Sequence, residues 1–157
     1  MNSNNILSRS RFSVLTLSSA ILWLLQLVLI FVKNMWLVSN GTRYGQALSI
    51  YSSARRDGMP WFANALLILC AIGVLLSVRA LLVGSSERPR YIGPRICSVL
   101  SFLLISAQRS LFKKATGVGF GMLKIHFGAV NLFWLLCIVL FVLSFLCSSA
   151  AKKDSGG

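Results

Sequence analysis

The residue types that carry out acid–base or metal chemistry are almost absent from this chain. It contains three acidic residues, Asp57, Glu87 and Asp154, and one histidine, His126. All four lie between or at the ends of long apolar stretches. General acid–base catalysis needs a positioned pair of titratable groups, and a metal site needs several ligands close together. The sequence therefore predicts no catalytic residue, no metal site and no cofactor, and we expect a protein that is not an enzyme.

Thiol chemistry is the next candidate, since the chain has four cysteines, Cys70, Cys97, Cys137 and Cys147. None has a CxxC spacing, and all lie in or at the ends of apolar stretches, so we expect no disulfide between loops. Cys97 and Cys147 lie near the ends of their stretches, which makes them candidates for reversible palmitoylation. The alternative is packing, because buried cysteine usually behaves as a small hydrophobic residue.

Asn40-Gly41-Thr42 is an acceptor sequence for N-glycosylation, provided that this loop faces the secretory lumen. Otherwise Asn40 is simply a turn residue. Asn-Gly between the strand-like segments 36–39 and 42–51 is a strong hairpin signal, because both turn positions favour positive φ. We therefore expect a short β-hairpin in the first connection, with Trp36 as the interfacial anchor that packs the hairpin onto the bundle.

The composition indicates that these features belong to a membrane protein. Of the 157 residues, 56% are hydrophobic and 12% are charged, with 16 basic residues against 3 acidic ones. A soluble domain of this size would need more polar residues to cover its surface. The basic residues flank the apolar stretches and form no single stripe, so we expect contact with the lipid bilayer and no binding to nucleic acid.

The apolar stretches predict four transmembrane helices, at 12–32, 61–83, 91–112 and 125–148. The first stretch runs on past its small residues, which favours a retained span over a cleaved signal peptide. The third is the weakest, because its apolar centre at 96–107 is too short to cross a bilayer. Its longer form includes Arg95 and Arg109, whose charged groups would have to reach the membrane surface. A re-entrant or interfacial segment is the alternative for this stretch.

Small residues inside these stretches would let the helices approach one another closely in lipid. The set comprises Gly73, Ser77, Ser98 and Gly128.

The order of these features resembles the four-span superfamily of claudins, peripheral myelin protein and the epithelial membrane proteins. Segment 34–40, Asn-Met-Trp-Leu-Val-Ser-Asn, is similar to the start of the first extracellular loop of the epithelial membrane proteins. Segments 64–69 and 90–93 are similar to the starts of their second and third spans, and 126–128 followed by Trp134 is similar to their fourth. The resemblance implies a plasma-membrane protein with Asn40 outside the cell and both termini in the cytosol. Charge alone gives no orientation, because eight basic residues fall on each side.

The expected fold class is thus an all-α membrane protein, a four-helix transmembrane bundle with a short extracellular β-hairpin in the first loop. The resemblance orients its parts as a cytoplasmic N-terminus at 1–11 and a first extracellular loop at 33–60. A short cytoplasmic loop at 84–90, a second extracellular loop at 113–124 and a cytoplasmic tail at 149–157 follow.

The chain also departs from the family pattern. Its first loop lacks the usual Gly-Leu-Trp and the two cysteines, and its tail lacks the apolar last residue that PDZ domains bind. We therefore expect lateral association with other membrane proteins, homo-oligomers included, and not sealing by a disulfide-pinned loop. The function implied is cell adhesion, junction organisation or regulation of a channel or receptor.

Two other classes of function stay open at this point. An accessory subunit of a larger membrane complex, for instance in the mitochondrial inner membrane, would suit the high basicity and short loops. A membrane enzyme of the glutathione-transferase type could use Arg79, Arg95 and Arg109, but no span contains an acidic residue.

The role of Trp36 leads to a first prediction. We expect Trp36→Ala to lower delivery of the protein to the cell surface, because the first loop would lose its anchor on the bundle. Surface biotinylation measures delivery, and thermal unfolding in detergent measures stability in parallel. Unchanged delivery together with unchanged stability would contradict the role of Trp36.

Overall fold

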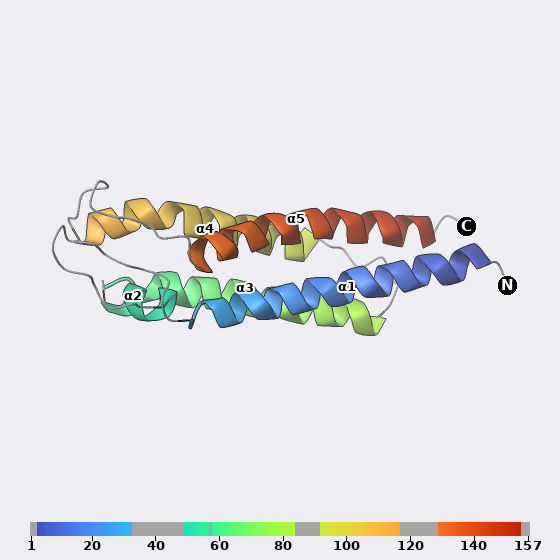
Figure 1. Ribbon diagram of the computed structural model, residues 1–157, viewed down its shortest axis with the longest axis horizontal. Helices are drawn as coiled ribbons and strands as arrows, with labels where there is room; N and C mark the ends of the chain where they lie inside the picture. Colours follow the sequence, from blue (N-terminus) through green and yellow to red (C-terminus); the bar gives the residue numbers. More distant parts are fainter. Residues whose placement is uncertain (1–2, 33–48, 57, 84–91, 117–128, 155–157) are drawn as a thin grey trace.

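The computed structural model describes residues 3–32, 49–56, 58–83, 92–116 and 129–154, which form five helices. They are α1 (Ser3–Leu29), α2 (Ile50–Arg56), α3 (Pro60–Val83), α4 (Ile92–Thr116) and α5 (Ala129–Asp154). Figure 1 shows the four long helices running along one axis, with the start of α1 and the end of α5 at one end of the bundle and the short α2 at the other.

Three of the helices are long and apolar enough to cross a membrane: Arg11–Leu29 within α1, all of α3, and Leu132–Ala150 within α5. In α4 the apolar part, Ile92–Ala107, is shorter, and the sequence marks the same stretch as the weakest span. Large apolar side chains point outward from every long helix, and more than half of the surface of Ile21, Leu75, Leu103 and Leu135 is exposed. The prediction of a helical, multi-pass membrane protein is confirmed at this level.

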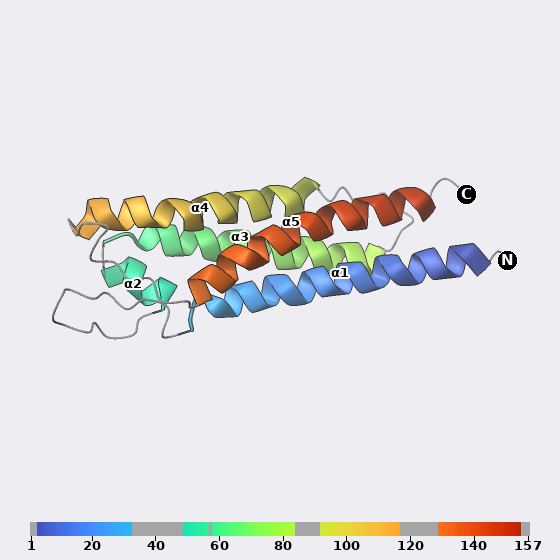
Figure 2. The same ribbon diagram turned by 45° about the horizontal axis from the view of Figure 1, so that its top comes forward.

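The four long helices form a closed ring. α1 packs against α3 and α5, and α4 packs against the same two helices on the other side. Successive long helices run in opposite directions, as Figures 1 and 2 show together, so each helix lies between two antiparallel neighbours. This is the up-and-down arrangement that short connections favour.

α1 and α3 approach each other closely at one point. The side chain of Trp23 is completely buried, and its ring lies directly over Gly73. A Cβ atom on Gly73 would fall well inside van der Waals contact with three carbons of that ring. One turn further along, the hydroxyl groups of Ser19 and Ser77 are hydrogen-bonded at 3.2 Å. Gly73 and Ser77 thus act as the close-packing small residues that the sequence suggests.

The predicted β-hairpin is not seen. The part of the chain that the structure describes contains no strand, and Ile50 and Tyr51, predicted as the end of the second strand, begin α2. The cause is local: the Ser49 hydroxyl accepts a hydrogen bond from the Ser52 backbone N–H at 3.1 Å, and the Ser52 hydroxyl accepts one from the Ser49 N–H at 2.9 Å. This reciprocal pair caps a helix N-terminus in the manner of a capping box. The rest of the predicted hairpin lies outside the described residues.

Substitution of Gly73 tests the α1–α3 contact. We expect Gly73→Ala to destabilise the bundle by about 1–3 kcal/mol, because overpacking a fully buried ring forces helices apart. Helix propensity alone predicts the opposite sign, since alanine is favoured over glycine inside a helix. Thermal unfolding in mild detergent measures the change.

Gly93→Ala is the matched control for this prediction. A Cβ on Gly93 would meet only the flexible end of the Leu76 side chain, at 2.7 Å, so a small rotation relieves it. A Gly73→Ala protein as stable as the Gly93→Ala protein would show that Trp23 and Gly73 are not in close contact.

Candidate functional site

The residues that the sequence singles out do not come together into one site. Trp36 and Asn40 lie outside the described residues, so the anchor role and the glycan stay predictions. Cys97 belongs to the main apolar core, and Cys147 packs with Phe12 and Ala80 in a second, smaller cluster. Both thiols are buried within the bundle. Their burial favours packing, and palmitoylation stays untested.

Hydroxyl groups make up most of the polar interior. Many of them bond back to the helix that carries them, as Thr16 does to the Phe12 carbonyl at 2.8 Å and Ser98 to the Arg95 carbonyl at 2.8 Å. Serine and threonine hydroxyl groups commonly form their hydrogen bonds in this way inside membrane helices. These bonds hold each hydroxyl against its own helix.

Gln26 makes the main polar contact between α1 and α5. Its side chain is completely buried, and Nε2 donates to the Phe133 carbonyl at 3.2 Å and to Cys137 Sγ at 2.8 Å. Gln26 Oε1 and, one turn away, Trp23 Nε1 have no hydrogen-bond partner among the described residues. Sequence reasoning gave Gln26 no role, although a single amide inside an apolar stretch is the available signal for such a contact.

A cation lies between α4 and α5. Arg95 Nε donates to the Ser144 hydroxyl and Nη2 donates to the Ser148 hydroxyl, each at 3.2 Å. The guanidinium carbon lies 3.6 Å from the centre of the Phe145 ring, a cation–π contact. Arg95 is half-buried, and its charged group reaches past Ser144 towards the end of the bundle, as expected for an arginine that snorkels.

Three arginines, Arg11, Arg79 and Arg95, lie towards this end of the bundle, and we call them the arginine layer. Phe12 of α1, Ala80 of α3 and Cys147 of α5 pack together there. Arg11 and Arg79 directly precede Phe12 and Ala80, and Arg95 binds Ser148, which directly follows Cys147. Arg11 and Arg79 are exposed, as the sequence predicts for Arg79. A cationic layer at the end of apolar spans marks a membrane surface.

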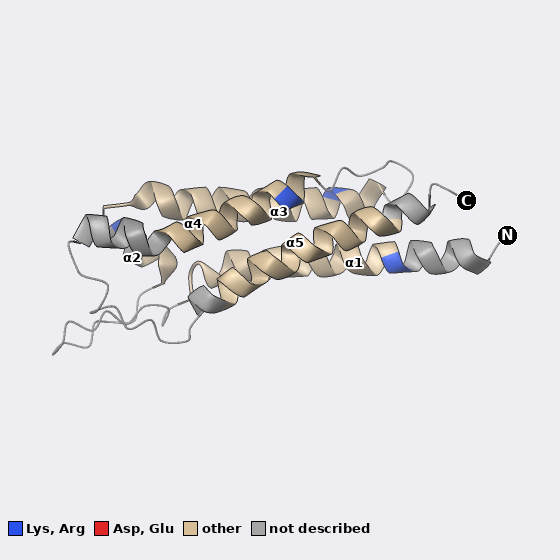
Figure 3. Ribbon diagram, turned by 90° about the horizontal axis from the view of Figure 1, so that it is seen from above, with Lys and Arg blue, Asp and Glu red and all other residues tan. Residues whose placement is uncertain are grey.

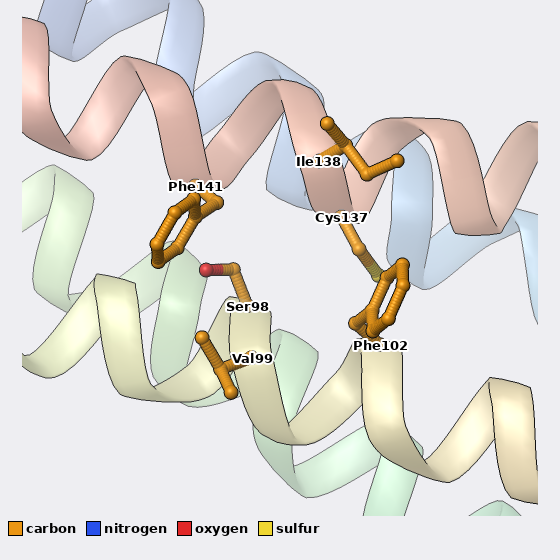
Figure 4. Close-up of a pocket in the computed structure, with 6 residues that line it drawn as sticks. All are labelled: Ser98, Val99, Phe102, Cys137, Ile138 and Phe141. Atoms are coloured by element: carbon orange, nitrogen blue, oxygen red, sulfur yellow. The ribbon is translucent and has the colours of Figure 1, made fainter.

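Next to this layer, a groove of about 220 Å³ opens between α4 and α5. We call it the α4–α5 groove; its lining residues are Ser98, Val99, Phe102, Cys137, Ile138 and Phe141. Figure 4 shows the α4 side chains facing those of α5 across the gap. Val99 and Ile138 are exposed, so the groove opens towards lipid. At its far end the rings of Phe102 and Trp134 stack 5.0 Å apart, and Trp134 Nε1 donates to the Ser106 hydroxyl at 3.1 Å.

The described side chains offer little material for catalysis. Figure 3 shows basic residues but no acidic ones among the residues that it colours by type. Three thiols, from Cys70, Cys97 and Cys137, belong to one core cluster, but within the described ranges no three His, Cys, Asp or Glu side chains are placed to hold a metal ion. We take the groove and the arginine layer as the candidate site.

Comparison with known proteins adds no relative. No family model, no curated protein and no solved structure matches this chain.

The burial of the thiols gives a further prediction. We expect N-ethylmaleimide to add to none of the four cysteines in the folded protein and to all four after unfolding in SDS, with intact mass as the measurement. Arg55→Cys is the positive control, because residue 55 is exposed on α2 and its thiol should react while the protein is folded. Rapid labelling of Cys97 or Cys147 in the folded state would contradict the buried positions and would favour their acylation.

Proposed function

We propose that this protein is a non-enzymatic four-span membrane protein that acts by lateral association with other membrane proteins, including copies of itself. The supporting observation is that polar and apolar side chains have separate roles. Inside the bundle, the side chains of Ser19, Ser77 and Gln26 form hydrogen bonds between helices. Outside, large apolar side chains cover the described spans. Such a molecule meets its neighbours through its surface.

In this proposal α4 also crosses the membrane, in addition to α1, α3 and α5. Its 25 residues extend about 37 Å at 1.5 Å per residue, against a bilayer core of about 30 Å. It packs between α3 and α5, and the charged group of Arg95 reaches the arginine layer at its start. Four crossings then put both termini on the same side of the membrane.

The finer assignment rests on the resemblance to the claudin superfamily. It comprises a plasma-membrane glycoprotein with cytoplasmic termini that organises cell adhesion or junctions, or regulates a channel or receptor. The alternative is an accessory subunit of a larger complex, such as one of the mitochondrial inner membrane. An N-linked glycan distinguishes the two, because only a loop that passes through the secretory lumen acquires one.

Glycosidase treatment of the full chain expressed in cells tests this assignment. We expect the enzyme to lower the apparent mass by one glycan, and we expect Asn40→Gln to abolish the shift. Thr42→Ser is the matched control, because it keeps the acceptor sequence and should keep the glycan. A first loop that carries no glycan and stays protected from protease on intact cells would contradict the plasma-membrane assignment.

The same protein, extracted in a gentle detergent, tests the association itself. Native electrophoresis should show a defined assembly larger than one chain. A free monomer would contradict lateral association, and a fixed stoichiometry with a large mitochondrial assembly would favour the alternative function.

A further inference from the structure

The charge of Arg95 has no partner of opposite sign among the side chains that the structure describes. Two of its five N–H groups bind neutral hydroxyls, and Phe145 covers one face of the guanidinium. Arg95 also lies in the first turn of α4, where the helix dipole is already positive and no acidic residue offsets it. A half-buried cation in an apolar environment is stabilised by a counter-ion. Arg95 is therefore a candidate site for an anion.

The α4–α5 groove continues from this cation towards the middle of the bundle. On α4, Arg95 is followed by Ser98, Val99 and Phe102 on the same face, one and two turns further in. On α5, Phe141, Ile138 and Cys137 follow in the same direction from Ser144, one of the Arg95 partners. The cation and the groove thus form one continuous surface, charged at the membrane surface and apolar below it.

The lining of the groove is suited to a hydrocarbon ligand. Only two of its side chains are polar, and both are already satisfied within the protein. The Ser98 hydroxyl donates to the Arg95 carbonyl, and Cys137 Sγ accepts from Gln26 Nε2. Its volume of about 220 Å³ is below the range of about 300–1,000 Å³ that is typical of pockets for drug-sized molecules. A slender aliphatic chain fits these conditions, and a bulky ring system does not.

We propose that the α4–α5 groove binds one acyl chain of an anionic phospholipid whose phosphate is held by Arg95. The guanidinium keeps its contacts with Ser144 and Ser148 and directs its remaining N–H groups to the phosphate oxygens. Arg11 and Arg79 lie towards the same end of the bundle and raise the positive potential there. The paired rings of Phe102 and Trp134 lie at the inner end of the groove, and the chain leaves it there towards the surrounding lipid. This inference does not depend on which membrane proteins the bundle contacts.

Native mass spectrometry of the delipidated full chain tests the proposal. The probes are phosphatidylglycerol and phosphatidylcholine with identical acyl chains. We expect one phosphatidylglycerol to bind with a Kd at least about tenfold lower than that of phosphatidylcholine. Both lipids carry the same phosphodiester, but the choline cation of phosphatidylcholine cancels the net negative charge that attracts the guanidinium. Equal affinity for the two lipids would overturn the role of Arg95.

Matched substitutions assign the two halves of the site. Arg95→Gln should remove the preference for phosphatidylglycerol, and Arg79→Gln, which removes the same charge from the same layer, should leave most of it. Val99→Phe should fill the groove and raise the Kd of both lipids about tenfold. Leu100→Phe should leave both values unchanged, because Leu100 is an equally exposed neighbour outside the groove. Equal losses in Arg95→Gln and Arg79→Gln, or in Val99→Phe and Leu100→Phe, would overturn the proposed position of the lipid.

Two further experiments test whether the site binds phosphate alone and whether Arg95→Gln stays folded. Glycerol 3-phosphate, which has the phosphate but no acyl chain, should not displace the lipid; displacement would show a phosphate site without a chain site. Arg95→Gln also removes contacts to α5, so its thermal stability is measured. Val99→Phe keeps those contacts and tests the groove even if Arg95→Gln unfolds.

Discussion

In a bilayer, apolar surface gains little by leaving lipid for another helix, so a bundle depends on close packing and on polar contacts between helices. Trp23 lying over Gly73 supplies close packing between α1 and α3, and the Ser19–Ser77 hydrogen bond lies one turn away. On its other side α1 is joined to α5 through Gln26. Residues 19, 23 and 26 follow one another at helical spacing, so one long face of α1 makes the contacts with both α3 and α5. The remaining architecture follows from this placement of α1.

The opposite half of the ring is held differently. α4 and α5 are joined at the membrane surface by Arg95 with Ser144 and Ser148, and further in by Trp134 with Phe102 and Ser106. Between these contacts Ser98 is small and Val99 and Ile138 turn partly outward, which leaves the groove. One interface is therefore filled by an indole ring, and the other is open to a ligand. The difference explains why the candidate site lies on α4 and α5 and not on α1.

The sequence predicts the long helices well, because an apolar stretch of sufficient length has few alternatives in lipid. It also identifies Gly73 and Ser77 as close-packing residues, but not their partners, since these depend on how the helices are rotated. Ser98, from the same set, lines the groove instead, and Gly128 lies outside the described residues. The hairpin prediction was wrong at Ile50 and Tyr51 because alternation of residue types was weighed above the Ser49–Ser52 capping pair. The groove could not be predicted, because it is a gap left between helices and no residue type encodes it. Arg95 was expected to reach the membrane surface, but its hydroxyl partners on α5 were not foreseen.

The contact of α1 with α3 can be measured directly in the membrane by disulfide formation in the double variant Ser19→Cys, Ser77→Cys. The two hydroxyl oxygens are 3.2 Å apart, so thiols in their place should join under mild oxidation and give one cross-linked peptide by mass spectrometry. The pair Ser19→Cys, Leu75→Cys, with residue 75 facing lipid, should give none. No cross-link between positions 19 and 77, or equal yields from the two pairs, would contradict the arrangement on which the bundle depends.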